Sequence, residues 1–325
     1  MPKFSIIIPV KSINDYVRET VPYIQALTVH EWELFIIPNN VEKSEWINDE
    51  RISIIESGRV GPADKRDLGA QKASGDVLVF LDDDSYPEPN ILEVASEYFN
   101  DPNIIAVGGP AVTPPTDSFW QRVSGAVFLS KYTGGSPERY VSAGQPREID
   151  DWPSVNLMVR KKQFIIVGGF DCKYWPGEDT KLCLKLKETG RKLIYVPTMI
   201  VWHHRRAGLK QHLKQVGAYG YHRGFFAKKY PQTSFRFKYF IPLLFASLVF
   251  TTVSSYWFPN IFIYLIPLWL VYLYIITIGI VETMKFENFF VALPLFFYVP
   301  LTHFYYGIQF IRGFIKQDNL VSRLR

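Results

Sequence analysis

Three consecutive carboxylates, Asp82, Asp83 and Asp84, follow directly on the apolar run Val77–Leu81. Apolar residues that leave no solvent face are typical of a buried parallel strand. In open α/β sheets, ligands bind just beyond the carboxyl ends of the strands, so these acids stand where chemistry is usually done. Because adjacent carboxylates repel one another, the run favours a hard divalent cation, such as the Mg²⁺ or Mn²⁺ that accompanies a nucleotide diphosphate.

The alternative for this run is a solvated turn, since Asp is common in turns and bonds nearby backbone groups. An EF-hand calcium loop fits less well, because the Gly and the distal Glu of that template are missing at the required spacing. The first predicted strand ends without G-x-G-x-x-G, and G-x-x-x-x-G-K-[ST] does not occur in the sequence. Dinucleotide and P-loop chemistry are therefore disfavoured.

Strand and helix patterns alternate around the acidic run. We expect strands at Phe4–Val10, Glu33–Ile37, Ile52–Ile55, Val77–Leu81 and Ile104–Val107, and helices at Ile13–Leu27, Ala63–Ala73 and from Pro89 to about Asn100. This order predicts an α/β fold with a mostly parallel sheet and helices on both faces. The region 110–153 is rich in Pro and Gly and is expected to form functional loops.

The apolar excess of the chain lies after Tyr239. Hydrophobic residues make up 48% and aromatic residues 16% of the 325 residues, and three stretches carry no Asp, Glu, Lys or Arg: Tyr239–Trp257, Asn260–Ile280 and Phe289–Ile311. Each is close to the ~20 residues that cross a hydrocarbon core as a helix. The stretches predict C-terminal transmembrane helices, with a buried helix hairpin of a soluble protein as the alternative.

A basic segment precedes these stretches. Residues 201–238 contain nine Lys and Arg and no Asp or Glu, whereas residues 1–200 contain 22 Lys and Arg against 28 Asp and Glu. A polybasic segment beside a membrane helix prefers the cytoplasmic leaflet, at ~1 kcal/mol per Lys or Arg. Nucleic acid is the other partner for such a segment, but its position beside membrane helices favours lipid phosphate, so no nucleic-acid partner is expected.

Two further observations favour a cytosolic body. The start Met1-Pro2-Lys3 leads straight into a strand, which predicts no secretory signal peptide. Cys172 and Cys183 are too few for a disulfide scaffold and form no metal-binding pattern.

The number of membrane crossings stays open at this point. Arg312, Lys316, Arg323 and Arg325 make the C-terminal end positive as well, and three crossings would place that end opposite the body. Two crossings, with the third stretch broken near Pro300, would remove the conflict.

An ordered set of motifs resembles the family 2 glycosyltransferases, which have the GT-A fold. The motifs are Phe4–Val10, Gly61–Ala63 with Lys65–Gly69, Gly75–Asp84, Gly168–Asp171, Gly177–Asp179 and His203–Arg206. Gln215–Gly220 and the tail His303–Ile308 look like the membrane-anchored branch that builds surface polysaccharides, the succinoglycan-type transferases among them. The resemblance implies a Rossmann-like GT-A domain over residues 1–236, with the basic juxtamembrane segment 203–238, and a membrane region over 237–325 with two or three helices.

The family moves a sugar from a nucleotide diphosphate to an acceptor, and the resemblance assigns roles to both acidic motifs. Asp82 and Asp84 resemble the DxD pair, in which the second acid binds a metal that bridges the phosphates and the first lies near the ribose or the metal. Glu178 and Asp179 resemble the catalytic acidic pair, with Asp179 in the position of the general base. Without the resemblance, these two acids fit better as residues stabilised by the dipole of a helix N-terminus.

The resemblance also implies the remaining contacts. His204 is favoured over His203 as a further metal ligand, and Lys65 and Arg66 stand where the family contacts the nucleotide, with ordinary solvated helix positions as their alternative. The predicted nucleotide-binding residues are completed by Pro9, Asn39 and Asp83. Asn39-Asn40 replaces the acidic pair that usually reads the nucleobase, and a UDP-sugar is the expected donor.

Gln215, Tyr219 and Arg223 match the QxxRW element of processive synthases only loosely, because Trp is absent. We therefore predict inverting transfer of a single sugar to a hydroxyl of a lipid-linked acceptor, by a multi-pass protein of the inner cell membrane whose catalytic domain is cytosolic. One alternative is a polyprenyl-phosphate sugar synthase, in which an ionised phosphate attacks and no base is needed. The other is a membrane-tethered protein that binds nucleotide sugars without catalysis.

Overall fold

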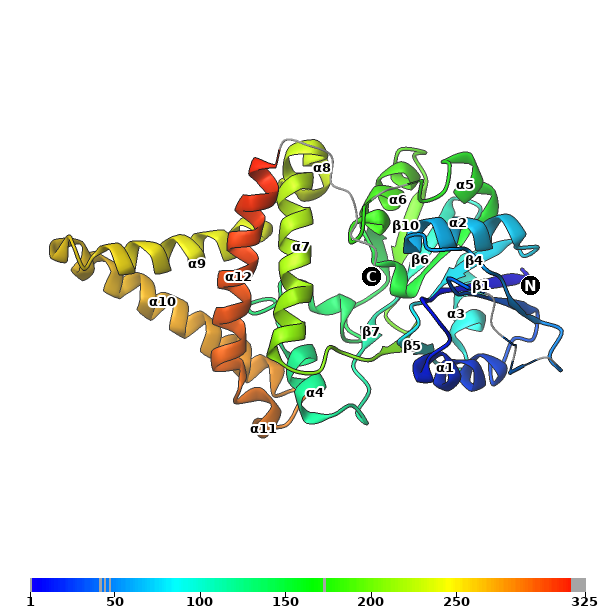
Figure 1. Cartoon of the computed structure of the whole chain (residues 1–325), viewed down its shortest axis with the longest axis horizontal. Helices are drawn as coiled ribbons and strands as arrows, with labels where there is room; N and C mark the ends of the chain where they lie inside the picture. Colours follow the sequence, from blue (N-terminus) through cyan, green and yellow to red (C-terminus); the bar gives the residue numbers. More distant parts are fainter. Residues whose placement is uncertain (1, 41–42, 44, 47, 172–173, 317–325) are drawn as a thin grey trace. The chain divides into compact units, whose positions relative to one another are not determined.

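The computed structural model describes residues 2–40, 43, 45–46, 48–171 and 174–316 (Figure 1). Cys172, Arg323 and Arg325, which entered the charge and cysteine arguments, lie outside these ranges. The chain divides into two compact units. The sheet unit comprises residues up to Val112 together with Val141–His204, and the helical unit comprises Thr113–Tyr140 together with the described residues from Arg205 onward.

The sheet unit is built on an eight-stranded sheet of order β3-β2-β1-β4-β9-β6-β10-β8. The strands are β1 Phe4–Pro9, β2 Trp32–Ile37, β3 Ile52–Ile54, β4 Val77–Phe80, β6 Ile104–Gly108, β8 Arg147–Ile149, β9 Leu157–Arg160 and β10 Lys192–Tyr195. Strands β3, β2, β1 and β4 run parallel, as do β6 and β10, whereas β9 is antiparallel to both of its neighbours and β8 to β10. The predicted mostly parallel sheet is therefore confirmed.

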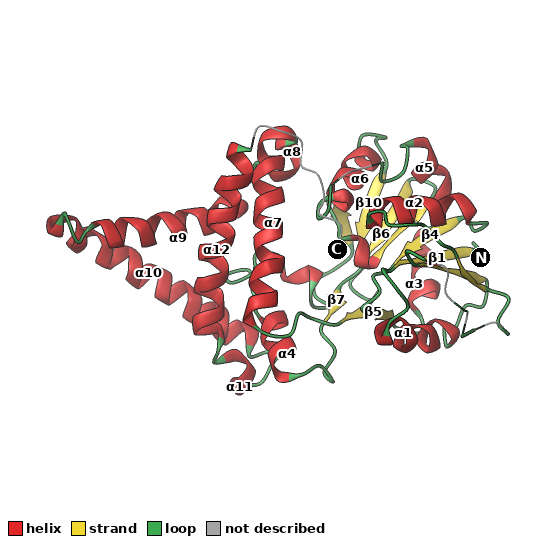
Figure 2. Ribbon diagram, in the orientation of Figure 1, coloured by secondary structure: helices red, strands yellow, loops and turns green. Residues whose placement is uncertain are grey.

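Helices cover both faces of this sheet (Figure 2). They are α1 Asp15–Gln25, α2 Pro62–Lys72, α3 Ile91–Tyr98, α5 Lys161–Ile166 and α6 Glu178–Lys187. Every residue of β1 is buried, and its side chains alternate between two apolar clusters. Ile6 packs in the cluster that includes α1 and α3, and Ile7 in the cluster that includes α2 and α6. Burial on both faces explains why β1 and β4 are mostly apolar along their whole length.

A second, three-stranded sheet has the order β5-β11-β7. Its strands are β5 Ser85–Pro87, β7 Ala111–Val112 and β11 Val201–His203. Strand β11 is antiparallel to β5, with His203 opposite Ser85. This pairing brings the end of β11 to the acidic run, although the two segments are far apart in the sequence.

The helical unit contains α4 Phe119–Ala126, α7 Leu209–Lys229, α8 Pro231–Ser234, α9 Phe237–Ser254, α10 Pro259–Thr283, α11 Phe289–Ala292 and α12 Leu295–Ile315. The region 110–153, predicted to be loops, thus contributes helix α4 to this unit. Three helical segments are long and apolar enough to cross a membrane: Phe237–Ser254, Pro259–Thr283 and Phe289–Ile315. The alternative of a break near Pro300 is not seen, because α12 runs through that residue and the interruption lies at Leu293-Pro294.

Candidate active site

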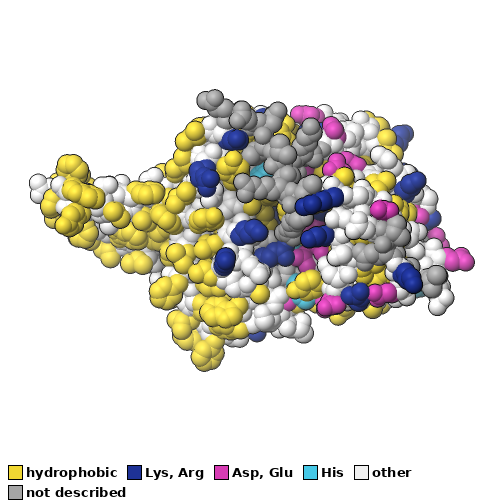
Figure 3. Space-filling model, viewed as in Figure 1, with side chains coloured by type: hydrophobic (Ala, Val, Ile, Leu, Met, Phe, Trp, Pro, Cys, Tyr) yellow, Lys and Arg dark blue, Asp and Glu magenta, His cyan; other side chains and the backbone are white. Residues whose placement is uncertain are grey.

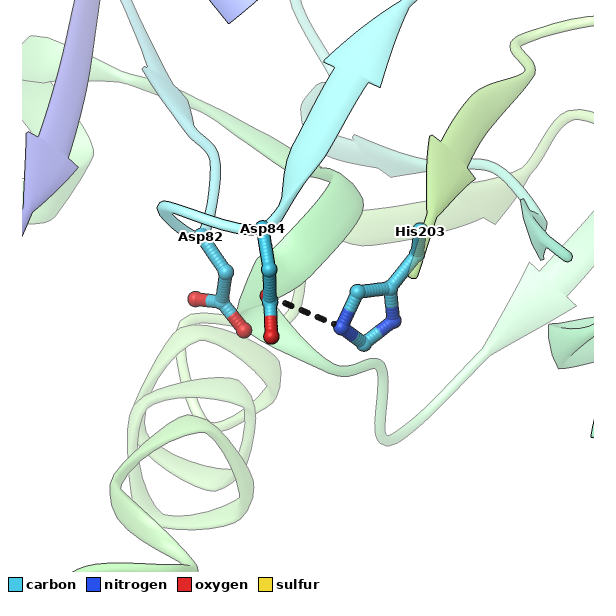
Figure 4. A group of neighbouring side chains, drawn as sticks. All are labelled: Asp82, Asp84 and His203. Carbon is cyan, nitrogen blue, oxygen red and sulfur yellow. Dashed lines mark hydrogen bonds and ion pairs between the residues drawn. The ribbon is translucent and has the colours of Figure 1, made fainter. Parts of the chain in front are cut away.

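The acidic run forms a tight turn between β4 and β5. Ser85 closes the turn, since its Oγ accepts a hydrogen bond from the Asp82 N–H at 3.1 Å and donates one to the Asp82 carbonyl at 2.8 Å. All four residues of β4 are buried, which fixes the start of the turn at the end of the strand. The carboxylates of Asp82 and Asp84 project from this turn in the same direction (Figure 4).

His203 joins the two acids from β11. Its Nε2 lies 3.1 Å from Asp84 Oδ1, and one ligand atom from each of Asp82, Asp84 and His203 lies within 4.8 Å of the others (Figure 4). Asp84 and His203 are 5% and 8% exposed. Two carboxylate oxygens and one imidazole nitrogen form a donor set that suits a transition metal such as Mn²⁺ better than Mg²⁺. The side chains therefore fit the divalent cation that the sequence predicts.

His204, the histidine that the sequence analysis favoured as a ligand, lies elsewhere. Its Nε2 is 3.0 Å from Glu19 Oε2, and its ring stacks on Tyr16 with 4.8 Å between the ring centroids. The His204 backbone N–H donates to the Asp84 carbonyl at 3.0 Å. Because successive side chains of an extended chain point in opposite directions, only one histidine of this pair can face the acids. The structure places His203 there.

Arg66 connects the two acidic motifs. Its Nη2 donates to Asp82 Oδ1 at 2.6 Å, and its Nη1 donates to Glu178 Oε1 at 3.0 Å. Arg66 is 3% exposed and Glu178 4% exposed, so neither occupies a solvated helix position. Burial raises the pKa of Glu178, the charge of Asp179 raises it further, and the Arg66 guanidinium opposes this shift.

Asp179 is the second residue of α6. Its Oδ1 accepts a hydrogen bond from the Thr180 N–H at 2.7 Å. Gly177, the residue before α6, has a φ of 115°, a conformation that glycine adopts without steric cost. The acidic pair is thus set at the helix N-terminus by a turn that requires glycine.

Asp67 holds the chain upstream of α6, a role that the sequence analysis did not identify. Its carboxylate accepts the backbone N–H of Phe170 at 2.9 Å and of Asp171 at 3.0 Å. Burial raises the pKa of Asp67, while these two hydrogen bonds lower it. Its presence in the motif Lys65–Gly69 was the only signal in the sequence.

Lys65 fixes the ends of two strands. Its Nζ donates to the Val10 carbonyl, to the Ile37 carbonyl at 3.2 Å and to Asn39 Oδ1 at 2.6 Å. These three acceptors match the three donors of an ammonium group. Pro9, the last residue of β1, is buried immediately before Val10. Lys65, Pro9 and Asn39 therefore lie together where β1 and β2 end.

Asp83, the middle acid, is not part of the three-residue group with His203. Its Oδ2 accepts a hydrogen bond from Asn14 Nδ2 at 2.8 Å. Asn14 is also the N-cap of α1, where its side chain accepts from the Val17 N–H. Asp83 thus ties the acidic turn to α1.

Comparisons with known proteins agree with this geometry. The model of glycosyl transferase family 2 matches residues 5–168. A pre-mycofactocin glycosyltransferase of Mycobacterium tuberculosis is 28% identical over 165 residues, which cover 49% of this chain and 33% of that protein. This chain therefore spans about one third of the length of that relative. A glucosyl-dolichyl phosphate glucuronosyltransferase of Haloferax volcanii is 26% identical over 213 residues, covering 59% of this chain and 66% of that protein.

A solved structure shares the fold. A mannosyltransferase from Pyrobaculum calidifontis, in complex with GDP-Man and Mn²⁺, superposes with a TM-score of 0.57 at 16% sequence identity and covers 97% of this chain and 87% of its own. The predicted GT-A fold is confirmed, while the succinoglycan-type branch stays a prediction. The ordered motifs, the α/β sheet and the matched residues lead to one conclusion: this chain is a member of glycosyl transferase family 2.

Proposed function

We propose that this chain transfers a single sugar from a nucleotide-diphosphate donor to a hydroxyl of a lipid-linked acceptor, with inversion at the anomeric carbon. The observation that carries the proposal is the group of Asp82, Asp84 and His203, which Arg66 links to the acidic pair at the start of α6. A buried guanidinium thereby connects a candidate cation-binding group to a candidate base.

Asp82, Asp84 and His203 are the residues that would hold the cation, and their nitrogen ligand favours Mn²⁺. When bound, the cation offsets the negative charge that develops on the departing diphosphate. Arg66 holds the Asp82 carboxylate in place by a hydrogen bond of 2.6 Å. The opposite charges of the guanidinium and the carboxylate strengthen this hydrogen bond and fix the orientation of the carboxylate.

Asp179 takes the proton from the acceptor hydroxyl in this proposal. A general base in position contributes a factor of ~10²–10⁴ to the rate. Glu178, buried and bonded to Arg66, orients the first turn of α6 and with it Asp179. The inverting outcome is taken from the family resemblance. It agrees with the single proposed base, because a direct displacement requires one base and no second nucleophile.

Asn39 is the residue that we assign to the nucleobase, because its amide can both donate to and accept from a base edge. Lys65 acts on the nucleotide through Asn39, whose Oδ1 it holds at 2.6 Å. A UDP-sugar remains the donor that we expect.

The lipid-linked acceptor is supported by two observations. The Haloferax volcanii relative is named for a glucosyl-dolichyl phosphate, and three helical segments of this chain are long and apolar enough to cross a membrane. We place the protein in the inner cell membrane with the sheet unit in the cytosol, acting in surface polysaccharide or glycan synthesis. The basic segment 203–238 supports this orientation.

Isothermal titration calorimetry of the purified chain with Mn²⁺ and a series of nucleotide sugars tests the proposal. We expect Mn²⁺-dependent binding of one donor, its loss in Asp84→Ala, and its retention in the control Asp15→Ala, since the Asp15 side chain is fully exposed on α1. Undiminished donor affinity of Asp84→Ala in the presence of Mn²⁺ would contradict the proposed site.

A further inference from the structure

Helices α7 and α12 pack backbone against backbone. A Cβ at Gly224 would lie 2.0 Å from the Phe310 carbonyl oxygen, and a Cβ at Gly313 would lie 1.9 Å from the Tyr221 carbonyl oxygen. The helices run parallel, since His212 near the start of α7 contacts Thr302 and Lys228 near its end donates to the Lys316 carbonyl. Each helix has 21 residues. If α12 lies in hydrocarbon, α7 must therefore lie in hydrocarbon as well.

Both ends of the exposed face of α7 are basic. Its exposed positions are Lys210, Gln211, Lys214, Tyr219, Lys228 and Lys229. Charged side chains are costly in hydrocarbon, so lysines near the ends of a membrane-spanning helix must reach the headgroups. If α12 crossed the bilayer, α7 would have to enter the hydrocarbon beside it with these side chains exposed.

The middle of α12 contacts a polar segment of the chain. His303 Nε2 lies 2.9 Å from the Thr133 carbonyl oxygen. Thr133 belongs to Thr113–Tyr140, which connects β7 with β8 of the sheet unit. This segment contains Lys131, Glu138 and Arg139 and no apolar stretch long enough to span a bilayer. The segment therefore lies on the same side of the membrane as the sheet unit, and so does the middle of α12, which contacts it.

The same segment contacts both ends of the α9–α10 hairpin. Lys238 Nζ, in the first turn of α9, donates to Ser136 Oγ at 3.3 Å, and Glu282, in the last turn of α10, accepts from Ser130. Residues 239–281 between these ends carry no Asp, Glu, Lys or Arg. Figure 1 shows α9 and α10 leaving the α7–α12 pair at a steep angle, and the face of the hairpin in view in Figure 3 carries hydrophobic and no charged side chains.

We propose that, among the described helices, only the α9–α10 hairpin crosses the hydrocarbon, and that α7 and α12 lie along the membrane surface on the side of the sheet unit. The exposed apolar residues of α12 include Phe297, Leu301, Ile311 and Ile315, which recur at helical spacing along one stripe. Such a stripe rests in the boundary between headgroups and acyl chains, while the lysines of α7 meet anionic headgroups. The membrane partner of this surface is an anionic bilayer. Every described Lys and Arg of the helical unit then lies on one side of the membrane, as the positive-inside rule requires.

Single cysteines test which side α12 ends on. In a chain whose own cysteines are replaced by serine, Ile315→Cys reports the end of α12, and Glu97→Cys, at an exposed position of α3, reports the sheet unit. A membrane-impermeant maleimide is applied to sealed vesicles of right-side-out and inverted orientation. We expect both cysteines to react in the same orientation of vesicle. Reaction of Ile315→Cys only in the opposite orientation would overturn the proposal.

Spin labels at Phe297→Cys, Leu301→Cys, Ile311→Cys and Ile315→Cys test whether α12 lies along the surface, through their depth in vesicles that contain anionic phospholipid. A helix in the plane of the membrane gives the four positions one shallow depth, whereas a spanning helix places the central positions deepest. Leu268→Cys on α10 supplies the deep reference, since this residue is 53% exposed on the hairpin. Central α12 positions as deep as Leu268→Cys would contradict the proposal.

The inference rests on the membrane location given under the proposed function, and the two fail differently. Release of the chain from membranes by alkaline carbonate would reject that location and the inference together. If the protein resists carbonate extraction but Ile315→Cys and Glu97→Cys react in opposite orientations of vesicle, the inference alone is rejected. The proposed transfer reaction is then unaffected.

Discussion

The two units pair charged groups in different ways. In the sheet unit, one guanidinium, that of Arg66, is shared by Asp82 and Glu178, with the carboxylate of Asp84 in the adjacent group. In the helical unit, Arg122 pairs with one carboxylate among the described residues, that of Glu287. Acids therefore outnumber the cation at the first cluster and balance it at the second. An excess of acids around one cation is unfavourable unless a further cation binds, which supports the proposed cation site, whereas a balanced pair fastens one segment to another.

The buried histidines extend this contrast. His203 lies among acids in the sheet unit, where a cation would be bound. His212 in the helical unit is 1% exposed, contacts the Thr302 hydroxyl and has no hydrogen-bond partner for its Nδ1 among the described residues. Burial lowers the pKa of His212 to about 4, so this ring is neutral and serves packing.

The largest effect that we expect concerns the sheet unit alone. Asp179→Asn removes the proposed base and should lower the rate of sugar transfer by ~10²–10⁴-fold, because proton removal in the transition state is lost. Donor binding by calorimetry should be almost unchanged, since Asp179 is not part of the cation group. Transfer at the wild-type rate would instead favour an acceptor that is already ionised, as in a polyprenyl-phosphate sugar synthase.

Arg66→Met sharpens the comparison between the clusters. It leaves buried Glu178 without its cation, and breaking a buried pair from one side costs ~3–5 kcal/mol. Denaturant unfolding in detergent should show this loss for the sheet unit. The double variant Arg66→Met, Glu178→Gln should regain part of it, because no uncompensated charge remains at that position. Equal stability of the single and double variants would show that the cluster is not electrostatically coupled.

The helical unit should lose stability in acid through His212. Its pKa is lowered in the folded state, so the unfolded chain binds the proton more tightly. The contribution is complete above the unfolded pKa of about 6.5 and declines as the pH falls toward 4. Between pH 7.5 and 5 this amounts to ~2 kcal/mol, at 1.36 kcal/mol per pKa unit. His212→Gln should weaken the pH dependence of the melting temperature of the helical unit over this range. An unchanged pH dependence in this variant would exclude His212 as its cause.

Arg122→Ala should have the smallest effect. The Arg122 side chain is 27% exposed, so solvent screens the pair with Glu287, and we expect a loss of ~1 kcal/mol. Sugar transfer by the correctly folded fraction should match the wild type. A loss of transfer comparable with that of Asp179→Asn would break the distinction between the ligand cluster and the structural pair.

The sequence predicted the elements that depend on local patterns. Strands β1 and β4 are apolar runs because both faces of the sheet are covered, and α9 and α10 are recognised by length and lack of charge. The family resemblance placed the acidic motifs in order along the chain. These features require no knowledge of which distant residues meet.

The sequence could not reveal contacts that depend on tertiary pairing. The choice between His203 and His204 depends on the register of β11 against β5, since a shift of one residue would exchange their directions. Likewise, the ion pairs that join Arg66 to Glu178 and Arg122 to Glu287 connect segments with no shared local pattern. For the same reason, composition indicated three stretches long enough to span a membrane without showing that α12 packs on the basic helix α7.

The central claim is that Asp82, Asp84 and His203 hold a divalent cation. Its most direct test is Mn²⁺ binding, measured by electron paramagnetic resonance, to the wild type and to the matched variants His203→Ala and His204→Ala. We predict one Mn²⁺ site in the wild type and in His204→Ala, and a large loss of affinity in His203→Ala. Loss of the site in His204→Ala with retention in His203→Ala would contradict the account.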